Sequence, residues 1–248
     1  MGRTLTRPCE RLAAAASLAA ACFSNTEKIT AIDVGCDHAK LSIYLVQSGI
    51  CSHVLAADVV DGPLAVAREN VGSRTLMGKS LADYIDIRKN DGIAGFEKEA
   101  ADAVFILGMG GELIASILER GEAFRKSHQG TLYILQAMTS EPFLRRYLAE
   151  HGFRVVNECT VTDKGRVYAI TVCIEDGEVR HFAPYAYELG TYLAEHPNRE
   201  MLPYLERKIR IFDKLTKELA AAGKDAEPET EMLRQFKLLR ERIMEETV

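Results

Sequence analysis

Short, almost continuously apolar runs alternate with helical patterns over the first two thirds of the 248-residue chain. Such runs predict strands that are covered on both faces, and the helices between them predict a parallel sheet. We therefore expect an α/β fold. The expected strands are Ala31–Val34, His53–Ala57, Tyr84–Arg88, Asp102–Gly111 and Thr131–Gln136, and the expected helices are His38–Gln47, Pro63–Val71, Glu112–Arg120 and Pro142–Glu150.

A β-hairpin is expected after these elements. Residues 153–176 contain two runs of alternating polarity joined at Asp163-Lys164-Gly165, which is a hairpin signal. Two antiparallel strands at the end of a mostly parallel sheet predict seven strands in all. That arrangement is typical of the Rossmann-like class I methyltransferase sheet and not of plain dinucleotide-binding folds.

The pattern becomes purely helical after Asp176. Apolar residues recur at spacings of three and four in two stretches, and a break with Gly223 and Pro228 separates them. Two such stripes predict an antiparallel helical hairpin, similar to a coiled coil, whose apolar faces meet. We therefore expect a first domain over residues 1–180 and a helical hairpin domain over residues 181–248. The stripes are Leu205, Ile209, Phe212, Leu215 and Leu219, and Met232, Phe236, Leu239 and Ile243.

Composition and cysteine usage indicate a soluble, cytoplasmic protein. The six cysteines are scattered without a C-x-x-C pair, which favours reduced thiols over a zinc site or disulfides, and we expect no metal. Arg3, Arg7 and Arg11 precede the apolar stretch Leu12–Phe23 in the manner of a secretion signal, but Glu10 interrupts the basic region. An alanine-rich helix packed on the domain is the favoured interpretation. No run approaches the roughly 20 apolar residues that cross a bilayer, so no membrane partner is expected.

The loop after the first strand contains a single glycine. Dinucleotide-binding loops carry three glycines at G-x-G-x-x-G spacing, but here Asp37 and Lys40 replace the second and third after Gly35. An acid at this position repels a pyrophosphate. The loop therefore indicates a ligand that is cationic and free of phosphate.

Acidic residues follow three successive strands, at the sheet edge where ligands of such folds bind. Asp58 is placed to accept from both ribose hydroxyls, Asp91 from an adenine amino group, and Asp37 suits a cationic methionine moiety. S-adenosylmethionine carries all of these groups and no phosphate. For some residues at this edge a purely structural role is also open. Asp33 could cap or order the loop, His38 could form a structural hydrogen bond, and Gly110 with Gly111 could form only a tight turn.

Several motifs together resemble the bacterial tRNA (adenine-22-N1)-methyltransferase family. They are "DVGCDHAKLSIYL", "DVVDGPLAVAREN", "NDGI", "ILGMGGELIASIL" and "YILQ", flanked by "LTRPCERLAAAA" and "GRVYAITVCIE". The resemblance covers most of the chain, including the C-terminal helices. It implies an S-adenosylmethionine-dependent enzyme that acts on tRNA. The implied cofactor-binding residues are Arg11, Asp33, Gly35, Asp37, His38, Asp58, Val59, Asp91, Gly92, Gly108, Met109, Gly110 and Gly111.

Asp37 and Gln136 are the candidate catalytic residues. Adenine N1 has a free lone pair, so alignment with the methyl group and stabilisation of the cationic product are the main tasks of the enzyme. Asp37 is expected to stabilise that charge, and Gln136 or the Gly108 carbonyl to hold the exocyclic amine. Because N1 lies on the Watson–Crick edge, the nucleotide must be unpaired or extruded.

Positive charge near the C-terminus gives a candidate surface for tRNA. The chain has a net charge of −5, but residues 199–217 hold six basic residues against three acidic ones, and Arg145, Arg146, Lys164 and Arg166 add more. A solvated helix face explains the same charges equally well. We expect a monomer or a weak homo-oligomer.

One segment departs from the family pattern. Members read Gln-Pro-Asn after the fifth strand, and this chain has Gln136-Ala137-Met138. Two alternative functions therefore stay open, namely a methyltransferase of another substrate and a cofactor-binding module without catalysis that acts through its helical hairpin.

Overall fold

The structure, a computed structural model, describes residues 8–23 and 29–245. A seven-stranded sheet in the order β5-β2-β1-β6-β7-β9-β8 forms its centre. Neighbouring strands are parallel from β5 to β7 in this order, whereas β9 is antiparallel to both β7 and β8. The strands are β1 Ile29–Val34, β2 Cys51–Asp58, β5 Ile85–Lys89, β6 Ala103–Gly110, β7 Leu132–Thr139, β8 Phe153–Asp163 and β9 Arg166–Glu175. The predicted fold class is confirmed.

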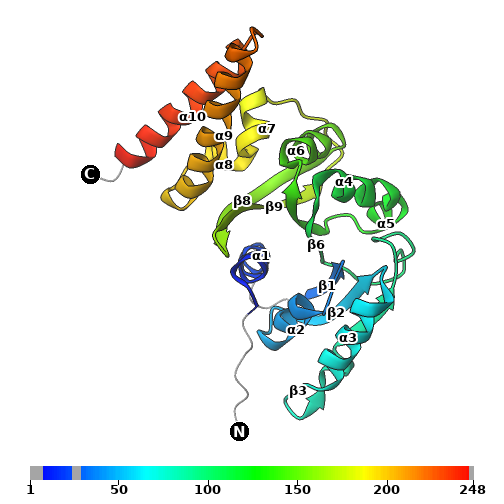
Figure 1. Ribbon diagram of the computed structural model, residues 1–248. Helices are drawn as coiled ribbons and strands as arrows, with labels where there is room; N and C mark the ends of the chain where they lie inside the picture. The colour runs from blue at the N-terminus through cyan, green and yellow to red at the C-terminus, as the bar shows by residue number, and fades with distance from the viewer. Residues whose placement is uncertain (1–7, 24–28, 246–248) are drawn as a thin grey trace.

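Helices cover both faces of the sheet (Figure 1). One apolar cluster joins α1, α2 and α3 to the sheet, and the other joins α4, α5 and α6 to the opposite face. Burial on both faces explains why the central strands read as continuous apolar runs. The helices are α1 Glu10–Ala20, α2 Lys40–Gln47, α3 Asp61–Gly72, α4 Gly111–Arg120, α5 Glu122–Ser127 and α6 Glu141–Glu150.

The alanine-rich N-terminal segment forms a helix packed on the sheet, as predicted. Ala15, Ala16 and Ala19 of α1 are almost fully buried, and the helix contacts β8 and β9. Arg3 and Arg7, which precede it, lie outside the described residues. No helix in residues 8–23 or 29–245 is long and apolar enough to span a bilayer.

Two boundaries differ from the sequence-based expectation. Helix α2 begins at Lys40 and not at His38, because Asp37 and Ala39 adopt left-handed backbone conformations with φ of 51° and 56°. Strand β7 continues past Gln136 to Thr139. Five short strands and helices were not expected from the sequence: β3 Thr75–Leu76 with β4 Lys79–Ser80, the helix α5, and the helices α7 Pro184–Leu189 and α8 Thr191–Glu195.

The C-terminal helices α9 Leu202–Ala221 and α10 Glu227–Glu245 form the expected hairpin. Their apolar stripes meet in a separate cluster that includes Phe212 and Phe236, whose rings are 5.4 Å apart. The hairpin lies beyond the β8–β9 end of the sheet (Figure 1), and α9 contacts β9. The division at residue 180 stays a prediction. Buried contacts between α6 and α9 cross it, and they are described below.

Candidate functional site

The loop after β1 is tied to the end of β2. The amides of Gly35 and Cys36 both donate to the carbonyl of Ala57, at 2.8 and 3.0 Å. Gly35 has a φ of +70°, which favours glycine, and a Cβ there would lie 2.2 Å from Cε of Met109. The glycine therefore allows both the turn and the close approach of the Met109 side chain from β6.

Asp33 is buried beneath this loop. Its carboxylate accepts a hydrogen bond of 2.6 Å from the hydroxyl of Ser42 in α2. Burial raises the pKa of Asp33 to about 6, although the bond from Ser42 acts in the opposite direction. The ordering role that the sequence left open for Asp33 is thus visible as a contact between β1 and α2, and the same residue also lines the cavity described below.

Asp58 at the end of β2 braces the loop from the other side. Its two carboxylate oxygens accept from the amides of Asp37 and Val60, at 3.1 and 3.0 Å. Each oxygen keeps a free lone pair, so the carboxylate can still accept from two hydroxyl groups. Asp37 is exposed, and one of its carboxylate oxygens lies 3.4 Å from Nε2 of His38.

Strand β6 carries a bulge at its carboxyl end. The pairing with β7 shifts between Leu107 and Met109, where Gly108 has a φ of +81°, and again between Met109 and Gly110. A Cβ on Gly108 would lie 3.2 Å from Nη1 of Arg11. The bulge and the missing side chain therefore let the Arg11 guanidinium approach the backbone.

Arg11 connects three segments that are far apart in the sequence. From α1 it donates a hydrogen bond of 2.6 Å to Oε1 of Gln136 in β7. Its guanidinium lies over the ring of Tyr168 in β9, 5.8 Å from the ring centroid. Gln136 is fully buried, and its Nε2 donates to the carbonyl of Ala137 at 2.5 Å.

A cavity of about 280 Å³ opens between the carboxyl ends of β1 and β6. The order of the strands reverses at this point, and there doubly wound sheets bind their ligands. Predicted site residues that line it are Arg11, Asp33, Gly35, Asp37 and Gly108. Residues that the sequence analysis did not single out as site residues also line it: Leu12, Cys36, Lys40, Leu41 and Leu107. Each of them is next to or near a predicted site residue in the sequence, and this proximity was the only sign by which they could have been predicted.

The other predicted cofactor residues surround this cavity at varying distance. Asp58 and His38 adjoin it through Asp37, and the amide of Asn90 donates to the Asp58 carbonyl, which brings the end of β5 close. Asp91 next to it is exposed and pairs with Arg120 at 3.0 Å. Val59 is exposed, whereas Gly92 is buried against Ile117.

Gly110 and Gly111 contact the turn after β7. A Cβ on Gly111 would lie 2.4 Å from the backbone oxygen of Ser140, and one on Gly110 would lie 3.2 Å from the hydroxyl of Thr139. Close packing between the start of α4 and this turn is therefore the role that these contacts indicate. The tight-turn interpretation left open for both glycines fits this packing.

The unusual Ala137-Met138 segment extends strand β7. Ala137 pairs with Met109 and Thr139 with Gly110, so the edge of the sheet is longer here. A proline at residue 137 would remove an amide from this ladder. The Met138 thioether lies 3.6 Å from Nε2 of Gln136, next to the candidate catalytic amide.

Part of the predicted basic surface is in fact buried. Arg145 is only 4% exposed and donates to Glu158, to the carbonyls of Tyr187 and Glu188, and to the Tyr204 hydroxyl. The prediction that Arg145 belongs to the basic surface was therefore wrong, because its guanidinium is paired with buried groups of the protein. Lys208 is likewise buried, with its amine 2.9 Å from Glu188.

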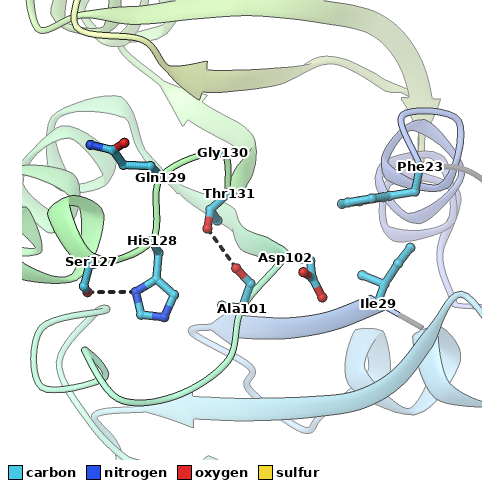
Figure 2. Close-up of a pocket in the computed structure, with 9 residues that line it drawn as sticks. All are labelled: Phe23, Ile29, Ala101, Asp102, Ser127, His128, Gln129, Gly130 and Thr131. Atoms are coloured by element: carbon cyan, nitrogen blue, oxygen red, sulfur yellow. Dashed lines mark hydrogen bonds between the residues drawn. The ribbon is translucent and has the colours of Figure 1, made fainter. Parts of the chain in front are cut away.

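A larger cavity, of about 590 Å³, lies at the opposite edge of the sheet (Figure 2). It is bounded by Phe23, Ile29 and the segment around His128, at the amino ends of β1 and β7. Two of its titratable side chains are engaged: Asp102 accepts from the amide and hydroxyl of Thr30 at 2.7 and 2.8 Å, and Nε2 of His128 lies 2.5 Å from the Glu99 carbonyl oxygen. The position of the cavity, at the amino ends of the strands, and the hydrogen bonds of Asp102 and His128 both argue against a catalytic role.

Neither a metal cluster nor a reactive thiol marks the site. Among the described residues no group of three or more His, Cys, Asp or Glu side chains could hold a metal ion. All six cysteines are free thiols. Burial and the neighbouring carboxylates of Asp33 and Asp58 raise the pKa of Cys36, so this cavity-lining thiol stays protonated.

The chain is similar to known tRNA methyltransferases. A family model described as tRNA (adenine(22)-N(1))-methyltransferase matches residues 31–247. The tRNA (adenine(22)-N(1))-methyltransferase of Bacillus subtilis (strain 168) is 28% identical over 213 residues, which cover 82% of this chain and 84% of that protein.

Solved structures agree with this similarity over almost the whole chain. A Streptococcus pneumoniae protein, crystallised as a candidate tRNA (m1A22) methyltransferase in complex with S-adenosyl-L-methionine, superposes with a TM-score of 0.77 at 26% identity, covering 94% of this chain and 100% of that one. The Bacillus subtilis m1A22 tRNA methyltransferase structure gives a TM-score of 0.72 at 25% identity, covering 98% and 99%.

Proposed function

The chain belongs to the tRNA (adenine(22)-N(1))-methyltransferase family, whose members use S-adenosylmethionine, and we propose that it methylates N1 of adenine 22 in tRNA at the cavity between β1 and β6. The observation that carries the assignment of the site is that Arg11, Asp33, Asp37, the turn glycine Gly35 and the bulge glycine Gly108 line one cavity. The family match supports the reaction, and the geometry supports where it takes place.

The residues of the cavity fit S-adenosylmethionine. Asp33 and Asp37 offer carboxylates to the cationic methionine moiety, and Arg11 offers a guanidinium to its carboxylate. The same two acids would repel the pyrophosphate of a dinucleotide. A volume of about 280 Å³ lies just below the ~300–1,000 Å³ of typical ligand pockets, so part of the nucleoside extends along the open edge.

The ribose and adenine are assigned to that open edge. Asp58 keeps one free lone pair on each oxygen for the two ribose hydroxyls. Asp91 lies next along the edge and is exposed, with its Arg120 partner also partly exposed. In our proposal its carboxylate turns from Arg120 toward the adenine amino group, while Val59 and Gly92 border the ring.

The target base is assigned to the side of the cavity near Gln136. S-adenosylmethionine supplies an electrophilic methyl group on a sulfonium ion when it is bound. The lone pair of adenine N1 needs no base to activate it, so positioning by Gln136 and the Gly108 carbonyl is the main contribution of the protein. Asp37 then stabilises the positive charge that develops on the methylated base.

The setting of the reaction forms part of the proposal. The tRNA substrate follows from the family, and we infer that the enzyme works in the cytoplasm as a monomer or a weak homo-oligomer. The Ala137-Met138 departure and the net negative charge are the observations that favour a small molecule or a protein as the methyl acceptor. A non-catalytic role through the helical hairpin is the other alternative, and the following experiment separates the proposed function from both.

The purified protein is incubated with S-adenosylmethionine and an unmodified tRNA transcript, and the digested nucleosides are analysed by mass spectrometry. We expect 1-methyladenosine, and none with a transcript in which adenine 22 is replaced by guanine. Cofactor binding in calorimetry without product would favour a different acceptor or a non-catalytic module, and methylation at another base would contradict the assignment.

The role of Asp37 is tested with Asp37→Ala. We expect the methylation rate at saturating cofactor to fall at least about tenfold, because charge stabilisation at the product base is lost. Asp83→Ala is the matched control, since Asp83 is an exposed acid on the short 3₁₀ turn before β5. Unchanged cofactor binding together with a wild-type rate in Asp37→Ala would show that Asp37 has no such role.

A further inference from the structure

A second cavity lies beside the proposed active site. It has a volume of about 380 Å³ and is formed by the end of β7, the β8–β9 turn and the first half of α9. The residues that matter for its chemistry are Met138, Arg166, Tyr168, Arg207 and Arg210. It thus combines three guanidinium groups with one aromatic ring and one thioether.

Tyr168 links this cavity to the first one. Its ring lines the second cavity and lies under the guanidinium of Arg11, 5.8 Å from the ring centroid. Arg11 in turn lines the first cavity and donates to Gln136. The second cavity therefore adjoins the side of the first at which we assign the target base, within reach of a neighbouring nucleotide of the same RNA strand.

Two of the three arginines are available for a ligand. Arg166 and Arg210 are exposed, and the side chain of neither forms an ion pair or hydrogen bond within the described part of the chain. Arg207 is held by the carbonyl of Val167 at 3.2 Å and by Glu141 at 3.3 Å, which fixes one guanidinium in the wall.

This availability contrasts with most of the other cations of the basic run, although Arg199 is also exposed and its side chain forms no ion pair with the described residues. Lys214 and Lys217 pair with Glu218 and Asp213 on the same helix, and Lys208 is buried. In a protein of net charge −5, cations that stay unpaired beside the proposed active site are those that an anionic ligand would meet first. A general coating of the helical hairpin by RNA has less support, because most of its charges are already neutralised.

We propose that this cavity binds the RNA strand next to the target adenosine, with Arg166 and Arg210 contacting a phosphodiester group and the Tyr168 ring stacking on the adjacent base. Planar guanidinium groups suit phosphate oxygens, and aromatic rings bind unstacked bases of any sequence. Met138 adds an apolar side chain to the residues that line the cavity. The assignment rests on the proposed function and adds the site that holds the flanking nucleotide.

The charge contribution is tested with the double variant Arg166→Gln/Arg210→Gln. Dissociation constants for the tRNA transcript are measured over a series of salt concentrations. We expect affinity at low salt to fall about tenfold or more, and the slope of log K against log salt to decrease in magnitude by about 1 to 2, because two phosphate contacts are lost. Calorimetry should give an unchanged affinity for S-adenosylmethionine.

Arg68→Gln/Lys98→Gln is the matched control. Both residues are exposed and their side chains form no ion pair with the described residues, and they lie on α3 and in the loop before β6. This variant removes the same net charge and should keep the wild-type affinity and slope. Equal losses in the two double variants would show a general charge effect and overturn the proposal.

The stacking contribution is tested with Tyr168→Phe and Tyr168→Ala. Stacking uses the ring and not the hydroxyl, so the phenylalanine variant should bind tRNA as wild type does, while the alanine variant should lose about 5- to 100-fold. Equal binding by both variants would overturn the stacking role. The proposed function would fail if the wild-type protein did not methylate tRNA. The affinities test only the second cavity, because they can be measured whether or not methylation occurs.

Discussion

At the scale of single residues, Asp33 is the group whose chemistry is most altered by the fold. It is 4% exposed and has Ser42 as its hydrogen-bond donor, and burial raises the pKa of its carboxyl to about 6. A carboxyl that titrates near neutral pH beside a cavity for a cation couples ligand binding to protonation. The same shift also affects folding: the folded state gains from a protonated Asp33 at pH below about 4, and this gain is lost as the pH rises through about 6.

Binding of S-adenosylmethionine should therefore depend on pH. The cationic ligand favours the ionised carboxylate, so binding releases a proton wherever Asp33 is protonated in the free protein. We expect affinity to rise about tenfold between pH 5 and pH 7, with a midpoint near 6, in calorimetric titrations.

The neutral variant Asp33→Asn is the informative comparison. It should bind S-adenosylmethionine more weakly at pH 7 and lose most of the pH dependence of binding. Asp83→Asn, on the exposed turn before β5, should bind with the same pH dependence as the wild type. If the pH dependence persists in Asp33→Asn, another group is responsible.

At the scale of elements, a buried polar network joins α6 to β8 and α9. Arg145 of α6 lies 3.3 Å from Glu158 of β8, and the Tyr204 hydroxyl of α9 donates to Glu141 at 2.7 Å. Thr171 of β9 completes it with a 2.8 Å bond to Glu158. Burial acts to raise the pKa of Glu141, but Arg145, Lys208 and the Tyr204 hydroxyl together hold that pKa below its ordinary value.

Arg145→Met should lower the free energy of unfolding by about 3 kcal/mol or more in urea denaturation. The variant keeps an unbranched apolar stem in place of the aliphatic part of the arginine but leaves Glu158 buried without its cationic partner, which is the costly way to break such a pair. Arg234→Met on α10 is the control, because the Arg234–Glu231 pair is exposed and its loss should not be measurable. A similar stability of both variants would mean that the buried pair contributes nothing net.

Most strands and helices could be predicted from the sequence. A strand that is buried on both faces has an apolar run in its sequence, and the hairpin turn, with φ of 49° and 75° at Lys164 and Gly165, requires residues that tolerate the left-handed conformation. The start of α2 was not predictable, since it depends on left-handed conformations at Asp37 and Ala39. Arg145 was misjudged because a basic residue beside another on an amphipathic helix reads as exposed. Only the packing of α6 against β8, α7 and α9 reveals its partners.

At the scale of the whole molecule, the site is assembled from segments that are distant in the chain. Arg11 and Gln136 are 125 residues apart, and Tyr168 comes from the hairpin that closes the sheet. The strand ends could be placed at one edge from topology alone. The contact of Arg11 with Tyr168 and the second cavity could not, because no local pattern encodes how a terminal helix packs on the last strands.

The same long-range packing bears on the division at residue 180. Tyr204 and Lys208 of α9 are buried against Glu141 of α6, so the helical hairpin and the sheet share polar groups that neither part can satisfy alone. Separation of the two parts would expose these charges and also open the contact of α9 with β9. The two predicted domains should therefore behave as a single cooperative unit.

We accordingly expect the full chain to unfold in one transition, with equal calorimetric and van't Hoff enthalpies. In native-state hydrogen exchange, the amides of α9 should open with the same free energy as those of the central strand β6, because both require global unfolding. Amides near the end of α10, whose Met244 side chain is exposed, should open earlier and serve as the internal comparison. Two separate transitions, with α9 exchanging well before β6, would show that the hairpin unfolds independently and that the shared polar network does not couple the two parts.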